Sequence, residues 1–310
     1  MKIISWNVRG LGNPRTFLAL KKIHHMHGPQ LVFLCETKPS TTQMNVTGKK
    51  LNFDSCFAVS CSGRGGVLAL LWNEETCVQI KSFSKHHIDA EVQMANGRQM
   101  RCTWVYVHPK MGQKQHTWTL LRRLAGSSPS PWLYFGDFNE ILHPHEKSGG
   151  NERNVNSINS FRQALRDCEL TDVGYKGYPF TWSNGRFGQR FIEERLDHFV
   201  CNRDWCDNFV NDAATNLNTW TSNHCPVLML VQEKGEKIDA SRSQSSRIHY
   251  EDMWSPYEAC KEIVREDWSL NSNWQSGNPS FLFRKIAKDS MARLLNWRKR
   301  EFRGRDKQLE

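Results

Sequence analysis

The sequence has no apolar run long enough to cross a membrane. Its most apolar stretch, residues 67–72, is far shorter than the ~20 residues that a spanning helix needs. Residues 1–7 also lack the apolar segment of a signal peptide. We therefore expect no membrane partner.

Paired cysteine spacing is absent as well. The ten cysteines include no C-x-x-C pair and show no repeated spacing. Cys35, Cys102 and Cys168 lie in apolar segments, where reduced thiols pack as small hydrophobic groups. This usage indicates a reducing, intracellular setting.

Acidic residues are in deficit. The chain has 32 Asp and Glu against 42 Lys and Arg, a formal net charge of +10. The surplus lies in the first 231 residues as well as in the C-terminal part, so it is not a tail effect. It favours a polyanionic partner, although a soluble basic protein with no nucleic-acid role would have the same charge.

What the sequence does contain is a succession of short apolar runs separated by turn residues. They predict strands at 2–8, 31–35, 67–72, 78–83, 88–94, 100–107, 132–135, 180–182, 196–200 and 227–231. Several runs are apolar on both faces, as in sheets covered on both sides. Asn96-Gly97 predicts a hairpin, and helices are predicted at 16–26, 113–124 and 158–168. Together they predict an α/β fold built as a layered sandwich rather than a strict βαβ repeat.

The composition changes after residue 231. Residues 232–250 hold few large apolar side chains and are predicted to form a linker. Helices are predicted beyond it at 257–268 and 281–303, the second with a basic face. We expect a domain at residues 1–231, a linker at 232–250 and a helical extension at 251–310.

Polar residues stand at the boundaries of five predicted strands: Asn7, Glu36, the pair Asp137 and Asn139, Asp197, and His224. Strand side chains alternate, so Asp137 and Asn139 should point the same way while Phe138 enters the core. A carboxylate beside an amide suits the handling of a phosphate. Each residue alone could be an ordinary turn or cap residue. The ordered set favours phosphoester chemistry.

This set resembles the endonuclease/exonuclease/phosphatase superfamily through Trp-Asn-Val-Arg-Gly, Glu36, Tyr106, Gly-Asp-Phe-Asn, Leu-Asp and His-Cys-Pro. Residues 180–184 and 194–197 are most similar to the abasic-site-type endonuclease of plant LINE-type (non-LTR) retrotransposon proteins. The resemblance covers residues 1–231. It implies a four-layered α/β sandwich, two mixed sheets flanked by helices, plus the C-terminal helical extension. Residues 248–310 resemble a connector that precedes a reverse transcriptase, which the chain does not reach, and the resemblance implies a nuclear protein.

The resemblance also implies the site residues. The metal ligands would be Glu36, Asn7 and Asn223, holding Mg²⁺ or alternatively Mn²⁺, and such an ion keeps most of its waters. The catalytic residues would be Asp137, Asn139, His224, Asp197 and Tyr106. Asp137 would activate the attacking water, Asn139 and Tyr106 would contact the phosphate, and His224 would be fixed by Asp197. Nucleic-acid contacts are expected from Trp182, Arg9 and Asn184, although Trp182 could equally be a core residue.

One position departs from the family pattern. The family usually has Ser-Asp-His before Cys-Pro, and this chain has Ser222-Asn223-His224. Asparagine keeps the shape of aspartate but drops its charge. The leading hypothesis is a Mg²⁺-dependent DNA endonuclease that nicks target DNA for retrotransposition, with the element's RNA as a further partner. The alternatives are a catalytically weakened nucleic-acid-binding remnant and a superfamily phosphatase.

Overall fold

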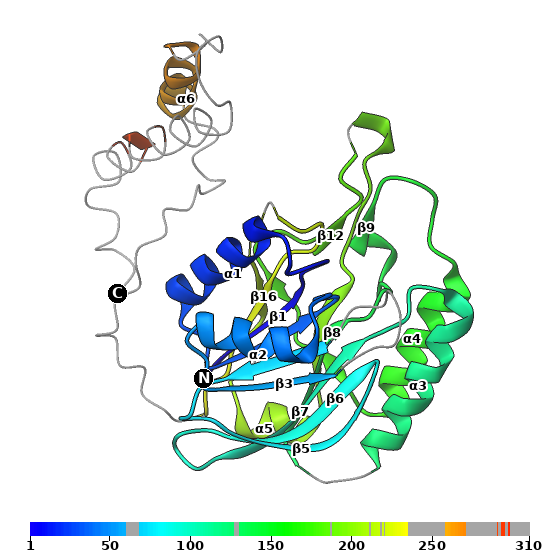
Figure 1. Ribbon diagram of the computed structural model, residues 1–310. Helices are drawn as coiled ribbons and strands as arrows, with labels where there is room; N and C mark the ends of the chain where they lie inside the picture. Colours follow the sequence, from blue (N-terminus) through cyan, green and yellow to red (C-terminus); the bar gives the residue numbers. More distant parts are fainter. Residues whose placement is uncertain are drawn as a thin grey trace. The chain divides into compact units, whose positions relative to one another are not determined.

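The computed structural model describes residues 1–59, 68–126, 130–186, 188–210, 212–217, 219, 221–234 and 258–270, and also residues 290, 293, 294 and 297. The chain divides into two compact units, Met1–Glu236 and Lys237–Glu310 (Figure 1). The predicted linker, residues 232–250, lies outside the described residues from position 235 onward.

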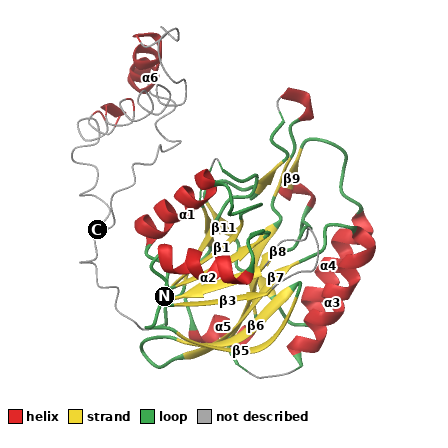
Figure 2. Ribbon diagram, viewed as in Figure 1, coloured by secondary structure: helices red, strands yellow, loops and turns green. Residues whose placement is uncertain are grey.

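The first unit contains two large mixed sheets (Figure 2). The seven-stranded sheet has the order β11-β15-β16-β1-β2-β4-β3. Its strands are β1 (Lys2–Asn7), β2 (Leu31–Cys35), β3 (Ser55–Val59), β4 (Leu68–Trp72), β11 (Tyr175–Lys176), β15 (Ala214–Asn216) and β16 (Val227–Leu230). Strand β1 pairs in parallel with β2 and antiparallel with β16.

The six-stranded sheet has the order β10-β14-β8-β7-β6-β5. Its strands are β5 (Cys77–Ser84), β6 (His87–Gln93), β7 (Gln99–Tyr106), β8 (Trp132–Asp137), β10 (Thr171–Asp172) and β14 (Asp197–Cys201). A small third sheet joins β12 (Trp182–Ser183), β13 (Glu193–Glu194) and β9 (Lys147–Ser148). The predicted hairpin is confirmed, because β6 and β7 pair antiparallel around Gly97, which has φ 85°.

Helices cover the outer faces of both large sheets. They are α1 (Pro14–His27), α2 (Thr41–Lys50), α3 (Met111–Ala125) and α4 (Val155–Asp167). The short α5 (Arg203–Asn208) instead contributes Trp205 to the core between the sheets. Figure 1 places α1 and α2 on one side of the sheets and α3 and α4 on the other. The predicted four-layered sandwich is therefore confirmed.

Alternation along the strands explains the layering. Phe33 of β2 and Trp104 of β7 pack in the core between the two sheets. Trp6 of β1 faces outward and packs in one cluster with residues of α1 and α2. Tyr134 of β8 packs with Phe161 of α4 on the opposite outer face. Central strands such as β1, β2, β7 and β8 thus contribute to two cores, which is why their residues are apolar on both faces.

Several elements differ from the sequence prediction. Helix α2 and strand β3 were not predicted, and the expected strand at 180–182 is reduced to Trp182–Ser183. Helix α2 buries only Met44 and Gly48, so its apolar periodicity is weak, but it begins with a capping box between Ser40 and Gln43.

The second unit contains α6 (Glu258–Leu270), which confirms the helix predicted at 257–268. Its Cys260 is buried in a cluster with Leu294 and Trp297. The helix predicted at 281–303 lies largely outside the described residues. Within the described part of the chain, no helix has the length and apolarity needed to span a bilayer.

Candidate active site

Strand ends from both large sheets meet at the candidate site. Asp137 ends β8, and it lies opposite Tyr106 of β7 on one side and Asp197 of β14 on the other. Asn7 ends β1 and lies opposite Cys35, directly before Glu36. The amide nitrogen of Asn7 donates hydrogen bonds of 2.9 Å to both Glu36 Oε1 and Asp137 Oδ2, so it links the two sheets.

Backbone conformation shapes this edge. A Cβ at Gly136 would lie 2.0 Å from the carbonyl oxygen of Val105, so only glycine lets β8 approach β7 here. Glu36, Arg9 and Asn139 have φ values of 52°, 47° and 50°, in the left-handed region that L-residues seldom occupy. Such conformations persist only where surrounding contacts hold them, which is typical of functional sites.

The left-handed turn at Asn139 corrects one expectation. Strand β8 ends at Asp137, so alternation no longer applies at Asn139, although Phe138 is buried in the core as predicted. The Asn139 backbone N–H donates to Asp137 Oδ1 at 2.9 Å, and its amide nitrogen donates to the carbonyl of Val107 at 2.8 Å. In this structure the side chain therefore ties two strand ends together.

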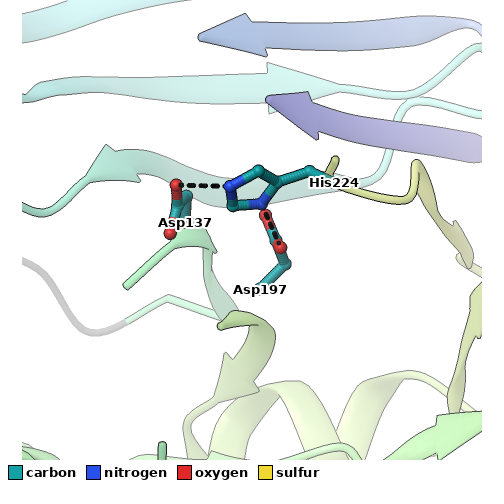
Figure 3. A group of neighbouring side chains, drawn as sticks. All are labelled: Asp137, Asp197 and His224. Carbon is teal, nitrogen blue, oxygen red and sulfur yellow. Dashed lines mark hydrogen bonds and ion pairs between the residues drawn. The ribbon is translucent and has the colours of Figure 1, made fainter. Parts of the chain in front are cut away.

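Asp137, Asp197 and His224 form a buried cluster (Figure 3). His224 Nδ1 lies 2.9 Å from Asp197 Oδ2, and His224 Nε2 lies 3.7 Å from Asp137 Oδ2. Burial alone would lower the pKa of His224, but the two aspartates raise it above its ordinary value. Burial raises the pKa of Asp137 to about 6, with His224 opposing the shift and Asp197 adding to it. The cluster can therefore hold a protonated ring beside a carboxylate that accepts protons near neutral pH.

Residues that sequence reasoning did not assign to the site hold this cluster in place. Trp6 Nε1 donates to the backbone carbonyl of His224 at 3.0 Å. Ser222 Oγ donates to the carbonyl of Asn7 at 2.8 Å and accepts from the His224 N–H at 3.2 Å. The buried Thr181 Oγ1 accepts from the N–H groups of Leu196 and Asp197. Their only sequence signal was their position beside the motif residues.

The three expected nucleic-acid contacts occupy different settings. Arg9 is half exposed, with its Nε 3.7 Å from Glu36 Oε2. Trp182 is half buried and packs against a small apolar cluster that includes Leu196. Asn184 uses its side chain within its own loop, donating to the carbonyl of Arg190 and accepting from the N–H of Ile192.

Asn223 is not part of the Asp137–Asp197–His224 cluster. One end of its amide lies 2.7 Å from Trp182 Nε1 and 3.1 Å from Arg9 Nη1, and because both neighbours are donors, we assign the amide oxygen to that end. A metal ligand needs a free oxygen, so this is not the arrangement expected of one.

The sequence matches the Endonuclease/Exonuclease/phosphatase family over residues 4–224. The chain belongs to this family. Among the curated proteins no sequence matches it. Its fold is similar to that of several solved structures.

Three such structures illustrate the range. The abasic endonuclease of Leishmania major is 18% identical, with a TM-score of 0.58 over 74% of this chain and 87% of that chain. The endonuclease domain of TRAS1, a telomere-specific non-LTR retrotransposon, is 13% identical, with a TM-score of 0.58 over 74% and 97%. The 3′ phosphatase NExo from Neisseria, bound to a product DNA hairpin, is 17% identical, with a TM-score of 0.56 over 75% and 99%.

The endonuclease/exonuclease/phosphatase family depends on a divalent metal ion, and the donor set here fits one. The Glu36 side chain is about a fifth exposed, and among the described residues the polar contact of its Oε2 is the 3.7 Å ion pair with Arg9. A partly solvated carboxylate is the kind of ligand that a hard cation takes. Asn7 would need to turn its amide, because its oxygen now accepts from the Arg9 N–H at 3.2 Å. Glu36 is therefore the principal candidate, with Asn7 beside it.

A second acidic and histidine group, Glu146, Asp172 and His198, has a structural role. Arg195 donates to Glu146 Oε1 at 2.7 Å and to both oxygens of Asp172. Burial alone would raise the pKa of Asp172, but His198 and the Arg195 guanidinium hold it well below its usual range. A guanidinium already fills this group, so it is not a second metal centre.

Proposed function

We propose that this chain is a Mg²⁺-dependent DNA endonuclease that nicks one strand of its target for retrotransposition. The observation that carries the proposal is the meeting of Glu36, Asn7, Asp137 and the Asp197–His224 pair at one edge, although they come from separate strands and loops. Acidic, amide and protonated imidazole groups together are the set that metal-assisted phosphodiester hydrolysis needs.

Each residue has a distinct task in this proposal. A Mg²⁺ ion bound at Glu36 would supply charge stabilisation for the scissile phosphate and the leaving 3′-oxygen. Asp137 accepts the proton of the attacking water, and its raised pKa of about 6 suits a general base near neutral pH. His224 donates a hydrogen bond to a phosphate oxygen, with Asp197 holding the ring and favouring its charged form.

Tyr106 belongs to the same site. Its hydroxyl donates to Glu36 Oε1 at 3.0 Å, and burial raises its pKa above its ordinary value, so it stays protonated. It therefore orients the proposed metal ligand and can turn its hydroxyl toward a phosphate.

DNA as the substrate is supported by charge and by the neighbours. The net charge of +10 favours a polyanion. Of the three similar structures described above, two are named as endonucleases and one holds a DNA product. A plant LINE-type origin, a nuclear location and an RNA partner belong to this same proposal.

A second candidate is a phosphatase that removes 3′-terminal phosphates from DNA, because one similar structure carries that name. The catalytically weakened remnant is the third, because of Asn223.

One experiment separates these readings. The full chain is incubated with supercoiled plasmid, with a 3′-phosphorylated DNA hairpin and with a soluble phosphoester, each with Mg²⁺ and with EDTA, and Glu36→Gln serves as the control. Mg²⁺-dependent nicking by the native chain, with none by Glu36→Gln, supports the endonuclease. Phosphate release without nicking supports the phosphatase, and DNA binding without either reaction supports the remnant.

A further inference from the structure

Asn223 lies where three parts of the chain meet. Its backbone carbonyl accepts from the Ser183 N–H at 2.9 Å, which joins the catalytic histidine loop to β12. Its amide oxygen lies 2.7 Å from Trp182 Nε1 and 3.1 Å from Arg9 Nη1. Both neighbours are obligate donors, so only the oxygen can occupy that position. One side chain thus bridges a guanidinium and an indole.

This bridge leaves the charge of Arg9 available to a substrate group. Among the described residues, the carboxylate within ion-pair distance of Arg9 is Glu36, at 3.7 Å through Nε. The closer contact, through Nη1, goes to the neutral amide of Asn223. The Arg9 side chain is 48% exposed, so a substrate group can reach it. An aspartate at position 223 would instead place a carboxylate at the 3.1 Å contact and neutralise the guanidinium.

We infer that Asn223 is a positioning residue for DNA binding. Its amide oxygen orients Arg9 toward a backbone phosphate next to the scissile one and fixes the Trp182 ring beside it. This inference rests on the proposed function, since the phosphate belongs to the DNA substrate. On this inference, the asparagine that replaces the family's usual aspartate serves substrate affinity. Decay of the site would instead only slow the reaction.

The two explanations of Asn223 predict opposite results for Asn223→Asp. If the asparagine is a damaged metal-support residue, the aspartate restores kcat and leaves DNA affinity unchanged. If it positions Arg9, the aspartate captures the guanidinium, so KM for DNA rises roughly tenfold while kcat gains nothing. The slope of log affinity against log salt should also become shallower by about 1, because one phosphate contact is lost.

The test measures the affinity of the full chain for a fluorescent DNA duplex in EDTA across a salt series, together with kcat and KM in Mg²⁺. The variants are Asn223→Asp, Asn223→Ala, Arg9→Ala and the Asn223→Ala/Arg9→Ala double variant. Asn223→Ala should weaken binding, and the double variant should bind no more weakly than Arg9→Ala, because Asn223 acts through Arg9. Gln115→Glu adds the same charge on the exposed side of α3 and controls for charge alone.

Three outcomes overturn the inference: a higher kcat for Asn223→Asp at unchanged KM, an unchanged salt slope, or additive losses in the double variant. Failure of the proposed function looks different, because the native chain would then not nick plasmid in Mg²⁺, while its DNA affinity and salt slope in EDTA would still be measured. Trp182→Phe keeps an aromatic ring but removes the indole N–H, so it should lose part of the affinity that Asn223→Ala loses. If Trp182→Phe binds DNA as tightly as the native chain, the indole N–H has no part in the bridge.

Discussion

Replacing Asp197 by Asn should slow DNA nicking about 30- to 150-fold while leaving DNA affinity unchanged. Asp197 has no expected contact with DNA, and it acts through the ring of His224, whose Nδ1 lies 2.9 Å from Asp197 Oδ2. Asparagine fills the same space and can still accept a hydrogen bond, so the change removes mainly the charge.

The magnitude follows from that contact. Both side chains are only 3% exposed, so solvent screens the interaction little. Two unit charges at this separation interact by about 6 kcal/mol at an effective dielectric constant of about 20, which is an upper bound. A hydrogen bond to a charged group is worth about 1.5–3 kcal/mol net. A loss of about 2–3 kcal/mol of transition-state stabilisation corresponds to the stated rate change.

The pH profile gives an independent measure. Asp197 and Asp137 together raise the pKa of His224, and the protonated ring is the proposed active form. Activity should therefore fall as pH rises through that pKa. Removing the charge of Asp197 lowers the pKa of His224, so the alkaline fall in nicking should begin at a lower pH in Asp197→Asn.

The assay is single-turnover nicking of supercoiled plasmid across a pH series for Asp197→Asn, His224→Ala and the double variant. Asp172→Asn is the matched control, because it removes a carboxylate from the Arg195 group and should leave the pH profile unchanged. The double variant should be little slower than His224→Ala, since the two residues act as one unit. A rate loss in the double variant equal to the product of the two single losses, or a pH profile of Asp197→Asn that does not shift, would refute the reasoning.

Four further predictions concern the metal ligand, DNA binding, strand packing and stability. Glu36→Gln should abolish Mg²⁺-dependent nicking at an unchanged thermal midpoint, because glutamine can still accept from Asn7 and Tyr106; nicking at the parent rate would exclude Glu36 as the ligand. The log of DNA affinity should fall linearly with the log of salt, by about 0.9 per phosphate contacted, and a flat titration would reject nucleic acid as the partner. Gly136→Ala should cost more than about 3 kcal/mol in denaturant unfolding, because its Cβ would meet Val105 O at 2.0 Å; native-like stability would contradict the close approach of β7 and β8. The carboxyl pKa of Asp172 lies below its unfolded value, so its contribution to the free energy of unfolding is present above about pH 4 and is lost as pH falls through the folded pKa. The stability of Asp172→Asn should therefore be less sensitive to acid in that range, and an unchanged loss of stability at low pH would contradict the Arg195 pairing.

Local sequence patterns were sufficient for most of the sandwich. Strand β2 was predicted with its observed ends, and Phe138 is buried as its place after an apolar run required. These features depend on side-chain alternation within a few residues, which a short window of sequence contains. Helix α2 was missed because it buries little, and Ser40 with Gln43 was the signal that could have revealed it.

The sequence by itself determined which residues are available for chemistry and at which strand ends they stand. It could not determine their distances. Asn7 and Asp137 are 130 positions apart, and they meet only because the two sheets pack face to face with these strand ends at the same edge of the sandwich. Nor could it give the conformations that aim the side chains: the left-handed turn at Asn139 and the rotation of the Asn223 amide toward Arg9 depend on donors and backbone from distant segments. Tertiary packing therefore decided the roles of residues that the sequence could only identify as candidates.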